Sequence, residues 1–285
     1  MKNQIELNRL SDMITHIITE ANKHEWQVKL KRLGRMYNLI FLVTLVMAFC
    51  ISILPFRLNW IASASTEPRE AVVRIETPDG QGSGFLISPY YILTARHVVE
   101  DCGIGSRVSV SFEQAKFPVE TGAEVVYYKE YDYAKFSEKN QPQLPDYIEY
   151  FENDVAILRL DEGIRQIAPL ALGNSDELKT GNVLIMGYGL GDWSEPDGKI
   201  TNNAYHSNSA LYKLDGSMNG GHSGGPIMLL ENNVPTKVIG ISVGDFSGLF
   251  TGFSGKVVTG EKVVLKINQA DKVMAAGGYN LRNLQ

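Results

Sequence analysis

The sequence after residue 66 predicts an all-β fold, and two observations support this prediction. Apolar and polar residues alternate in short runs, which is the pattern of half-buried strands. Gly, Pro and Asn separate these runs, as they do at turns between strands. A region of about 220 residues is long enough to bury about 70% of its unfolded surface without cross-links. The clearest runs are Ala71–Thr77, Arg107–Phe112, Ala123–Tyr128 and Lys262–Ile267.

Residues 1–36 are predicted to form an amphipathic helical leader. Apolar side chains recur at helical spacing among mixed charges and form one stripe. Such a stripe could pair with a second copy of the chain, lie on a membrane or bind a cytoplasmic partner, and all three alternatives stay open. The stripe consists of Leu10, Met13, Ile14, Ile17, Ile18 and Ala21.

Residues 37–56 predict a single transmembrane helix. The stretch 39–54 contains no charged residue, and with its flanking residues it reaches the length of about 17 to 25 residues that a bilayer requires. Basic residues are more frequent before the segment than after it, so we expect a cytoplasmic N-terminus and an extracytoplasmic β-rich region, periplasmic or extracellular. The residues compared are Lys29, Lys31, Arg32 and Arg35 before the segment and Arg57 and Arg69 after it.

A cleaved signal peptide is the alternative to this anchor. Residues 62–64 resemble a small-residue processing site, but the charged leader is longer than an ordinary signal-peptide n-region. We therefore favour an uncleaved signal anchor, followed by a linker at 57–67. Cys50 would then lie in the membrane and Cys102 outside it, so these two cysteines cannot form a disulfide.

Glycines surround one serine in the segment Gly220–Pro226. Glycine adopts positive φ and allows close approach of another chain, so successive backbone N–H groups can point at one oxygen beside the Ser223 hydroxyl. An ordinary Gly-rich turn with a loop hydroxyl has the same composition. A base and an orienting acid elsewhere in the chain would favour the interpretation of Ser223 as a nucleophile.

Two further segments supply these groups. His97 follows the β-rich run Tyr91–Thr94, and an ordinary pKa of about 6.5 suits a histidine to proton transfer near neutral pH. Asp154 begins the alternating run before Leu160, and its carboxylate would hold the imidazole in one tautomer. Taken alone, His97 could be an ordinary core histidine, Asp154 a turn residue at a strand start and Ser223 a loop serine. Their order along the chain favours catalysis, with Ser223 as nucleophile, His97 as base and Asp154 as orienting acid.

These motifs resemble those of the trypsin-like (chymotrypsin-fold) serine peptidases, in particular the disulfide-poor bacterial type, over nearly all of the chain after residue 66. The resemblance implies two six-stranded antiparallel β-barrels with the active site in the cleft between them. The peptidase domain is expected at 68–275, with barrels at about 68–162 and 176–270 and a tail at 276–285. The matching blocks are Leu93–His97, Asn153–Leu158 and Gly221–Pro226, with weaker similarity in Gly181–Gly189, Val238–Gly244 and Gly248–Thr251.

The resemblance also implies binding residues. The backbone N–H groups of Gly221 and Ser223 would form the oxyanion hole, and Ser217 would lie at the base of the primary specificity pocket. Because this base is neutral, we expect an apolar or aromatic side chain before the scissile bond. Ser242 is also placed to support the catalytic aspartate. The other pocket residues would be Ser242, Val243, Gly244 and Gly248.

Two segments depart from the family pattern. Activatable members carry aspartate before the nucleophile, whereas this chain has His222, and no matching new amino terminus occurs near residues 66–76. We therefore expect control by location, loop order or a partner, and we interpret His222 as pointing away from the nucleophile and not as a second base. The segment Tyr127–Tyr150 is expected to be an irregular surface insertion.

Composition argues against other classes of function. A net charge of −5 without a basic stripe does not suit nucleic-acid binding. The five histidines lack ligand spacing, so we expect no metal and no other cofactor. The sequence predicts a membrane-anchored serine endopeptidase that cleaves protein or peptide substrates through an acyl-enzyme. The alternative is a catalytically silent protease-fold binding or sensor module at the membrane.

Overall fold

The computed structural model divides the chain into two compact units, Met1–Ser63 and Ala64–Gln285. The residues that it describes are 10, 12–23, 25–27, 29–38, 41, 42, 44, 67–132, 144–202, 210–245 and 262–285.

In the first unit, every described residue is helical, and the apolar side chains from Leu10 to Ile18 are exposed. Most of the predicted transmembrane helix at 37–56, together with residues 57–66 of the predicted linker, lies outside the described residues. Within the described part of the chain, no helix has both the length and the apolar character needed to cross a membrane.

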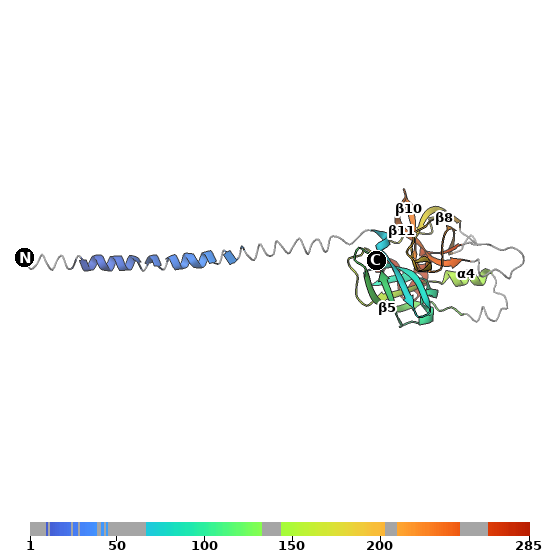
Figure 1. The fold of residues 1–285 in the computed structure, drawn as a ribbon, viewed down its shortest axis with the longest axis horizontal. Coiled ribbons are helices and arrows are strands. Elements are labelled where there is room, and N and C mark those ends of the chain that lie inside the picture. The colour runs from blue at the N-terminus through green and yellow to red at the C-terminus, as the bar shows by residue number, and fades with distance from the viewer. Residues whose placement is uncertain are drawn as a thin grey trace, which may run out of the picture. The chain divides into compact units, whose positions relative to one another are not determined.

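In the second unit, six antiparallel strands close the first barrel in the order β1-β2-β3-β6-β5-β4. The label β5 in Figure 1 marks this barrel. Its strands are β1 (Val72–Thr77), β2 (Gly80–Ser88), β3 (Tyr91–Thr94), β4 (Arg107–Phe112), β5 (Val119–Tyr128) and β6 (Ala156–Leu160).

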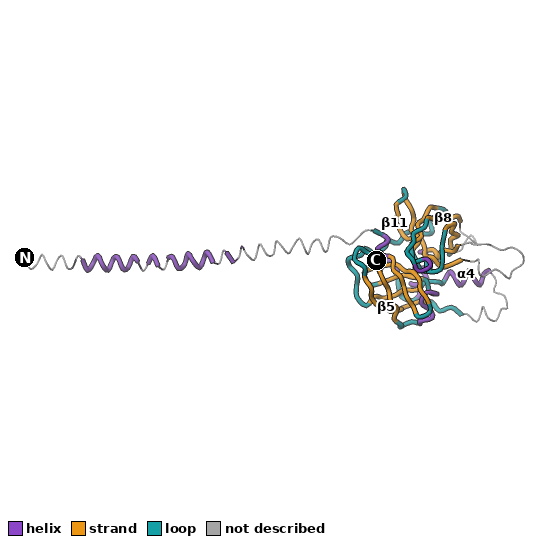
Figure 2. The backbone as a smooth tube through the Cα atoms, in the orientation of Figure 1, coloured by secondary structure: helices purple, strands orange, loops and turns teal. Residues whose placement is uncertain are grey.

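The second barrel also has six antiparallel strands, in the order β10-β11-β12-β9-β8-β7. Figure 2 shows the strands of this unit in two groups, one around β5 and one around β8 and β11. The predicted pair of six-stranded barrels is therefore confirmed. The strands are β7 (Gly181–Ile185), β8 (Asp197–Asn202), β9 (Leu211–Gly216), β10 (Pro226–Glu231), β11 (Val234–Asp245) and β12 (Lys262–Lys266).

Alternating side chains explain why these segments form barrels. In β4, Val108, Val110 and Phe112 are buried, whereas Ser109 and Ser111 between them are partly exposed. Successive side chains of a strand point to opposite faces, so one face of β4 fills the barrel. The larger apolar cluster extends from the first barrel into the second, and a smaller cluster lies within the second barrel.

Short helices connect and cover the barrels, and two of the longer ones were not predicted. Leu144–Glu152 forms α4, although the segment ending at Tyr150 was expected to be irregular. Pro145 suits the first turn of a helix, and Tyr147 and Phe151 form a buried face with helical spacing. The helices are η1 (Pro68–Ala71), α2 (Arg96–Val99), η2 (Glu100–Cys102), α4 (Leu144–Glu152), η3 (Gly189–Gly191), α5 (Ile267–Ala276) and α6 (Leu281–Leu284).

The C-terminal helices pack on the barrels. α5 directly follows β12 and buries Ile267, Ala270 and Met274. Leu281 in α6 is fully buried, and the Gln285 side chain donates to the Leu170 carbonyl at 2.7 Å. The last residues therefore contribute to the link between the barrels.

Candidate active site

Strand pairing brings His97 and Asp154 together. Thr94, at the end of β3, pairs with Ala156, at the start of β6. His97 lies in α2 shortly after β3, and Asp154 lies shortly before β6. Since the two strands are antiparallel, both residues leave the same end of the pair.

The Asp154 carboxylate binds both the ring and the backbone of His97. Nδ1 of His97 lies 2.7 Å from Oδ2 of Asp154, and the His97 amide donates to Oδ1 at 3.0 Å. Asp154 is fully buried, while the His97 side chain is 28% exposed. The contact to the carboxylate assigns the proton to Nδ1, so Nε2 is the ring nitrogen that can accept a proton.

The Asp154 carboxylate also makes His97 more basic. Burial lowers the pKa of His97, but the charge of Asp154 and the hydrogen bond to it outweigh burial and raise the pKa above its ordinary value of 6.5. Glu100 raises the pKa further and Arg96 opposes this effect. A histidine of this kind is a stronger base than one in water.

The turn that carries Ser223 rests on the end of the first barrel. The Ser83 amide in β2 donates to the Ser223 carbonyl at 2.7 Å. Gly224 has φ of +83°, and a Cβ there would collide with the Ser83 carbonyl and Thr94 Oγ1. The backbone of Ser223 therefore lies beside the strand end that leads to His97. Among the described residues, no hydrogen bond joins the Ser223 hydroxyl to His97.

Three backbone N–H groups in this turn, those of Gly220, Gly221 and Ser223, have no hydrogen-bond partner within the described residues. We call those of Gly221 and Ser223 the two free amides. The amides of His222, Gly224 and Gly225 each donate to a backbone carbonyl. The two free amides are the same groups that the family resemblance assigns to the oxyanion hole, and they are available to a substrate oxygen.

Carbonyl contacts fix the direction of the two free amides. The Gly220 carbonyl accepts from the Leu190 amide at 2.6 Å, and the His222 carbonyl accepts from the Gly225 amide at 2.9 Å. In a trans peptide the N–H points opposite to the C=O. The Gly221 amide therefore points away from Leu190, and the Ser223 amide points away from the Gly225 amide.

Ser83 is a site residue that sequence reasoning missed. It is fully buried, and its hydroxyl donates to the Gly221 carbonyl at 2.7 Å and accepts from the Tyr188 amide at 2.9 Å. It therefore links β2 of the first barrel to two segments of the second. The small flanking residue Gly82 was the available signal, because a Cβ there would collide with the Val98 side chain and lie 3.2 Å from the Ser223 carbonyl oxygen.

The predicted specificity pocket is only partly described. Ser217 is exposed, Ser242 and Val243 are buried, Gly244 is partly buried, and Gly248 lies outside the described residues. Among the described residues, no hydrogen bond joins the Ser242 hydroxyl to Asp154, and this hydroxyl lies 3.6 Å from the Sδ atom of the buried Met218.

The residue before the candidate base is a buried arginine. Arg96 is fully buried, and its guanidinium carbon lies 5.1 Å from the ring centre of Tyr131 and 4.6 Å from that of Tyr150. Its Nε atom lies 3.0 Å from Oε2 of Glu100. These cation–π contacts tie the insertion and α4 to the helix that carries His97.

α4 also reaches the second barrel. It contacts β9 and β12, and Figure 1 shows it beside the orange strands. Phe151 lies against β11, since a Cβ on Gly244 would be 3.2 Å from its ring. Glu152 accepts a hydrogen bond from the Ala210 amide at 3.1 Å. The chain segment directly before Asp154 is thus held by both barrels.

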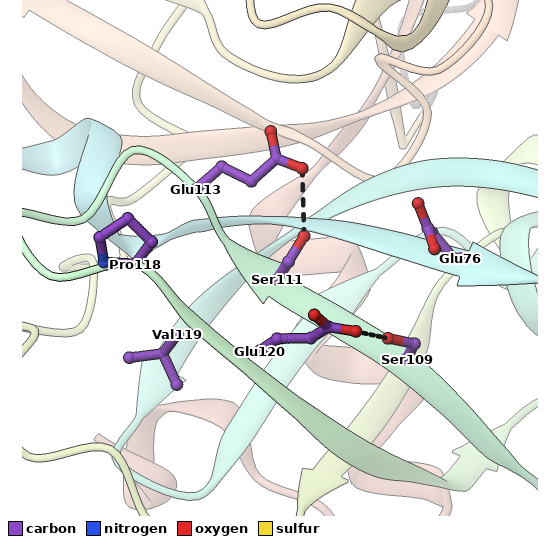
Figure 3. Close-up of a pocket in the computed structure, with 7 residues that line it drawn as sticks. All are labelled: Glu76, Ser109, Ser111, Glu113, Pro118, Val119 and Glu120. Carbon is purple, nitrogen blue, oxygen red and sulfur yellow. Dashed lines mark hydrogen bonds between the residues drawn. The ribbon is translucent and has the colours of Figure 1, made fainter.

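A pocket of about 350 Å³ on the first barrel is lined by strands β1, β4 and β5. Figure 3 shows Ser111 paired with Glu113 and Ser109 paired with Glu120, at 3.3 Å and 3.4 Å. The pocket contains none of the predicted site residues. Among the described residues, no group of three or more His, Cys, Asp or Glu side chains could hold a metal ion.

The two barrels and the site residues define the class of trypsin-like serine peptidases. The family described as the trypsin-like peptidase domain matches residues 82–241, which is more than half of the chain, and the chain belongs to this family. No curated protein sequence matches the chain significantly.

Solved structures show the same fold. The inactive form of Rv3671c from M. tuberculosis H37Rv, as a serine-to-alanine mutant, superimposes with a TM-score of 0.52 at 21% identity, over 75% of this chain and 90% of that chain. The inactive Rv3671c protease gives 0.51 at 21% identity, over 76% and 93%. The HtrA-type protease AlgW, as a serine-to-alanine variant with a tripeptide, gives 0.50 at 22% identity, over 76% and 62%. At these identities the likeness concerns the fold alone.

Proposed function

We propose that the protein is a serine endopeptidase that uses Ser223, His97 and Asp154. The observation that carries the proposal is the 2.7 Å contact between Nδ1 of His97 and the buried Asp154 carboxylate. This contact leaves Nε2 as a base with a raised pKa, beside a serine turn that presents two free amides. Base, acid, serine and amides are the groups that acyl transfer requires.

In the proposed mechanism, the Ser223 hydroxyl attacks the scissile carbonyl and its proton passes to Nε2 of His97. The two free amides bind the resulting oxyanion. Collapse of the tetrahedral intermediate breaks the scissile C–N bond, and His97 gives the proton to the leaving amine. A water molecule then attacks the acyl-enzyme and gives a proton to His97. The ester C–O bond breaks, His97 returns the proton to Ser223 Oγ, and the acid leaves. Throughout, Asp154 holds the ring and stabilises the imidazolium.

Hydrolysis of an unfolded protein tests this function. Full-length protein is incubated with reduced, carboxymethylated casein, and new amino groups are measured. Wild type and Ser175→Ala are expected to cleave, because the buried Ser175 lies before β7 and its hydroxyl accepts from the Asn268 amide in α5, outside the serine turn. Ser223→Ala should be inactive. Lack of cleavage in all three would instead favour the catalytically silent binding or sensor module.

For the substrate, we propose an apolar or aromatic side chain before the scissile bond. The neutral Ser217 at the position assigned to the pocket base supports this preference, since such a pocket gains mainly from apolar burial. Cleavage of a peptide library tests it. Products that end mainly in Lys, Arg or Glu would contradict it.

We also propose that residues 37–56 anchor the protein in a membrane, with the N-terminus cytoplasmic and the peptidase unit extracytoplasmic. The uncharged stretch 39–54 and the basic residues before it support this proposal. The N-terminal helix would then be available to a second copy or a cytoplasmic partner. Carbonate extraction and protease accessibility in sealed spheroplasts test the topology. Release of the protein by carbonate would argue against the anchor.

A further inference from the structure

His222 lies between the two free amides, and its side chain is buried. Only 1% of the residue is exposed. Its Nε2 atom lies 2.8 Å from the Ser194 hydroxyl, and its Nδ1 atom lies 3.1 Å from the Asn219 amide nitrogen. A Cβ on Gly189 would collide with the ring. The ring therefore occupies a fitted space between the serine turn, η3 and the Ser194 segment.

The shorter of two Nδ1 contacts favours one neutral tautomer of this ring. Nδ1 lies 3.1 Å from the Asn219 amide nitrogen, which can only donate, and 3.3 Å from the Asn219 carbonyl oxygen, which already accepts the His222 amide. Nε2 then carries the proton and donates it to the Ser194 hydroxyl. Burial lowers the pKa of His222, which also favours the neutral ring.

This ring supports the segments that orient both free amides. Asn219 lies at the start of the serine turn, where its carbonyl also accepts the His222 amide at 3.1 Å. Gly189, which the ring contacts, precedes Leu190, whose amide binds the Gly220 carbonyl. Displacing the ring would loosen two peptide bonds. The bond between Gly220 and Gly221 carries the Gly221 amide, and the bond between His222 and Ser223 carries the Ser223 amide.

We propose that neutral His222 is a positioning residue for the oxyanion site, holding the Gly221 and Ser223 amides in place through its contacts with Asn219, Ser194 and Gly189. The ring touches neither substrate nor Ser223 in this role. It acts by fixing the turn and η3 before a substrate binds, which is the arrangement that electrostatic stabilisation of an oxyanion requires.

The inference rests on the proposed function, and its test separates the two. Hydrolysis of p-nitrophenyl acetate by full-length protein gives kcat and KM, and near-UV circular dichroism gives the folded fraction. We expect the wild-type protein to hydrolyse this ester and the Ser223→Ala variant not to. If wild type shows no such hydrolysis, the proposed function and this inference are both overturned.

Three substitutions of His222 then test the positioning role. His222→Ala removes every ring contact and should lower kcat per folded molecule about 100-fold, the range seen when an oxyanion donor is lost, with KM changed less than about threefold. His222→Asn keeps an acceptor for the Asn219 amide and should stay within about tenfold of wild type. His222→Gln keeps only a donor toward Ser194 and should resemble the alanine variant.

Loss of stability alone would give a different result. Ser175→Ala removes a part-buried hydrogen bond between the segment before β7 and α5, donated by the Asn268 amide, and should leave kcat per folded molecule unchanged. With wild type active, an unchanged kcat in His222→Ala would overturn the inference alone. If His222→Ala does not fold, the other two variants decide. Equal values of kcat in His222→Asn and His222→Gln would overturn the inference, and a higher kcat in His222→Asn would support it.

Discussion

The Ser83 hydroxyl in the first barrel donates a hydrogen bond of 2.7 Å to the Gly221 carbonyl in the second. The amide of the same serine donates to the Ser223 carbonyl at 2.7 Å. One buried residue therefore fixes the serine turn relative to the strand end that leads to His97. The alignment of the candidate nucleophile and base depends on this contact between barrels.

Ser83→Ala is expected to slow the reaction of Ser223 with a fluorophosphonate about tenfold, because a lost buried hydrogen bond costs about 1–3 kcal/mol. The rate of labelling in folded protein measures this effect. Ser88→Ala in the same buried strand is the matched control. Equal labelling rates for wild type and Ser83→Ala would contradict the positioning role of Ser83.

The activity should rise with pH through a midpoint above 6.5. His97 must be neutral to accept a proton, and Asp154 raises its pKa against the effect of burial. The neutral fraction of His97 therefore increases as pH rises through this raised pKa. A pH profile of kcat/KM for p-nitrophenyl acetate measures the midpoint, and a midpoint below 6.5 would argue against His97 as the base.

Asp154→Asn should lower kcat by about 10³ to 10⁴, because an amide at this position can favour the wrong tautomer of His97. It also removes the negative charge that raises the pKa of His97, so the remaining activity should have a lower pH midpoint. Steady-state kinetics over a pH series measure both effects. An unshifted midpoint would show that another group controls the profile.

Arg96→Ala is expected to destabilise the folded protein by about 3–5 kcal/mol, since it breaks the ion pair between the fully buried guanidinium and Glu100 and removes two cation–π contacts. Urea unfolding measures this change. Arg107→Ala breaks a pair with Asp161 in which the arginine is 65% exposed, and it should cost less than about 1 kcal/mol. Similar losses in both variants would contradict the structural importance of Arg96.

His222 should make the protein less stable in acid. Burial lowers the pKa of His222, outweighing the Asn219 backbone contact, and Lys262 is the one charged group among the described residues that acts on the ring, lowering the pKa further. As pH falls below about 6.5, the unfolded chain binds a proton that the folded chain does not, so stability decreases toward the folded pKa. Above this window the contribution is fully present.

Urea unfolding at pH 7.5 and 5.0 tests this linkage. Wild type should lose more stability between the two pH values than His222→Asn, which has no group that titrates at this position. His97 contributes with the opposite sign and at higher pH, since its pKa is raised. Equal losses in the two proteins would show that His222 does not titrate in this range.

Local motifs predicted which candidate site residues lie together better than they predicted the contacts that support them. His97 and Asp154 each stand at a strand end that the alternation of apolar residues revealed, so strand pairing alone brings them together. The role of Ser83 depends on the approach of two barrels, which no local pattern encodes. The contact between the Ser242 hydroxyl and the Met218 sulfur likewise joins residues that no local pattern relates.

The missed helices had signals of different strength. In α5, Ile267, Ala270 and Met274 are spaced for one buried face, so periodicity could have revealed it. In α4, Tyr and Glu residues around Pro145 resemble an irregular loop, and packing of Phe151 against the second barrel stabilises the helix. Tertiary contact outweighed local propensity there.

Labelling of Ser223 tests the central claim most directly. Full-length wild-type protein is treated with a fluorophosphonate probe, and the modified peptide is identified by tandem mass spectrometry. The proposed mechanism predicts a single adduct on Ser223 that is absent in Ser223→Ala and strongly reduced in Asp154→Asn. Folded wild-type protein without an adduct on Ser223 would contradict the assignment of this serine as the nucleophile.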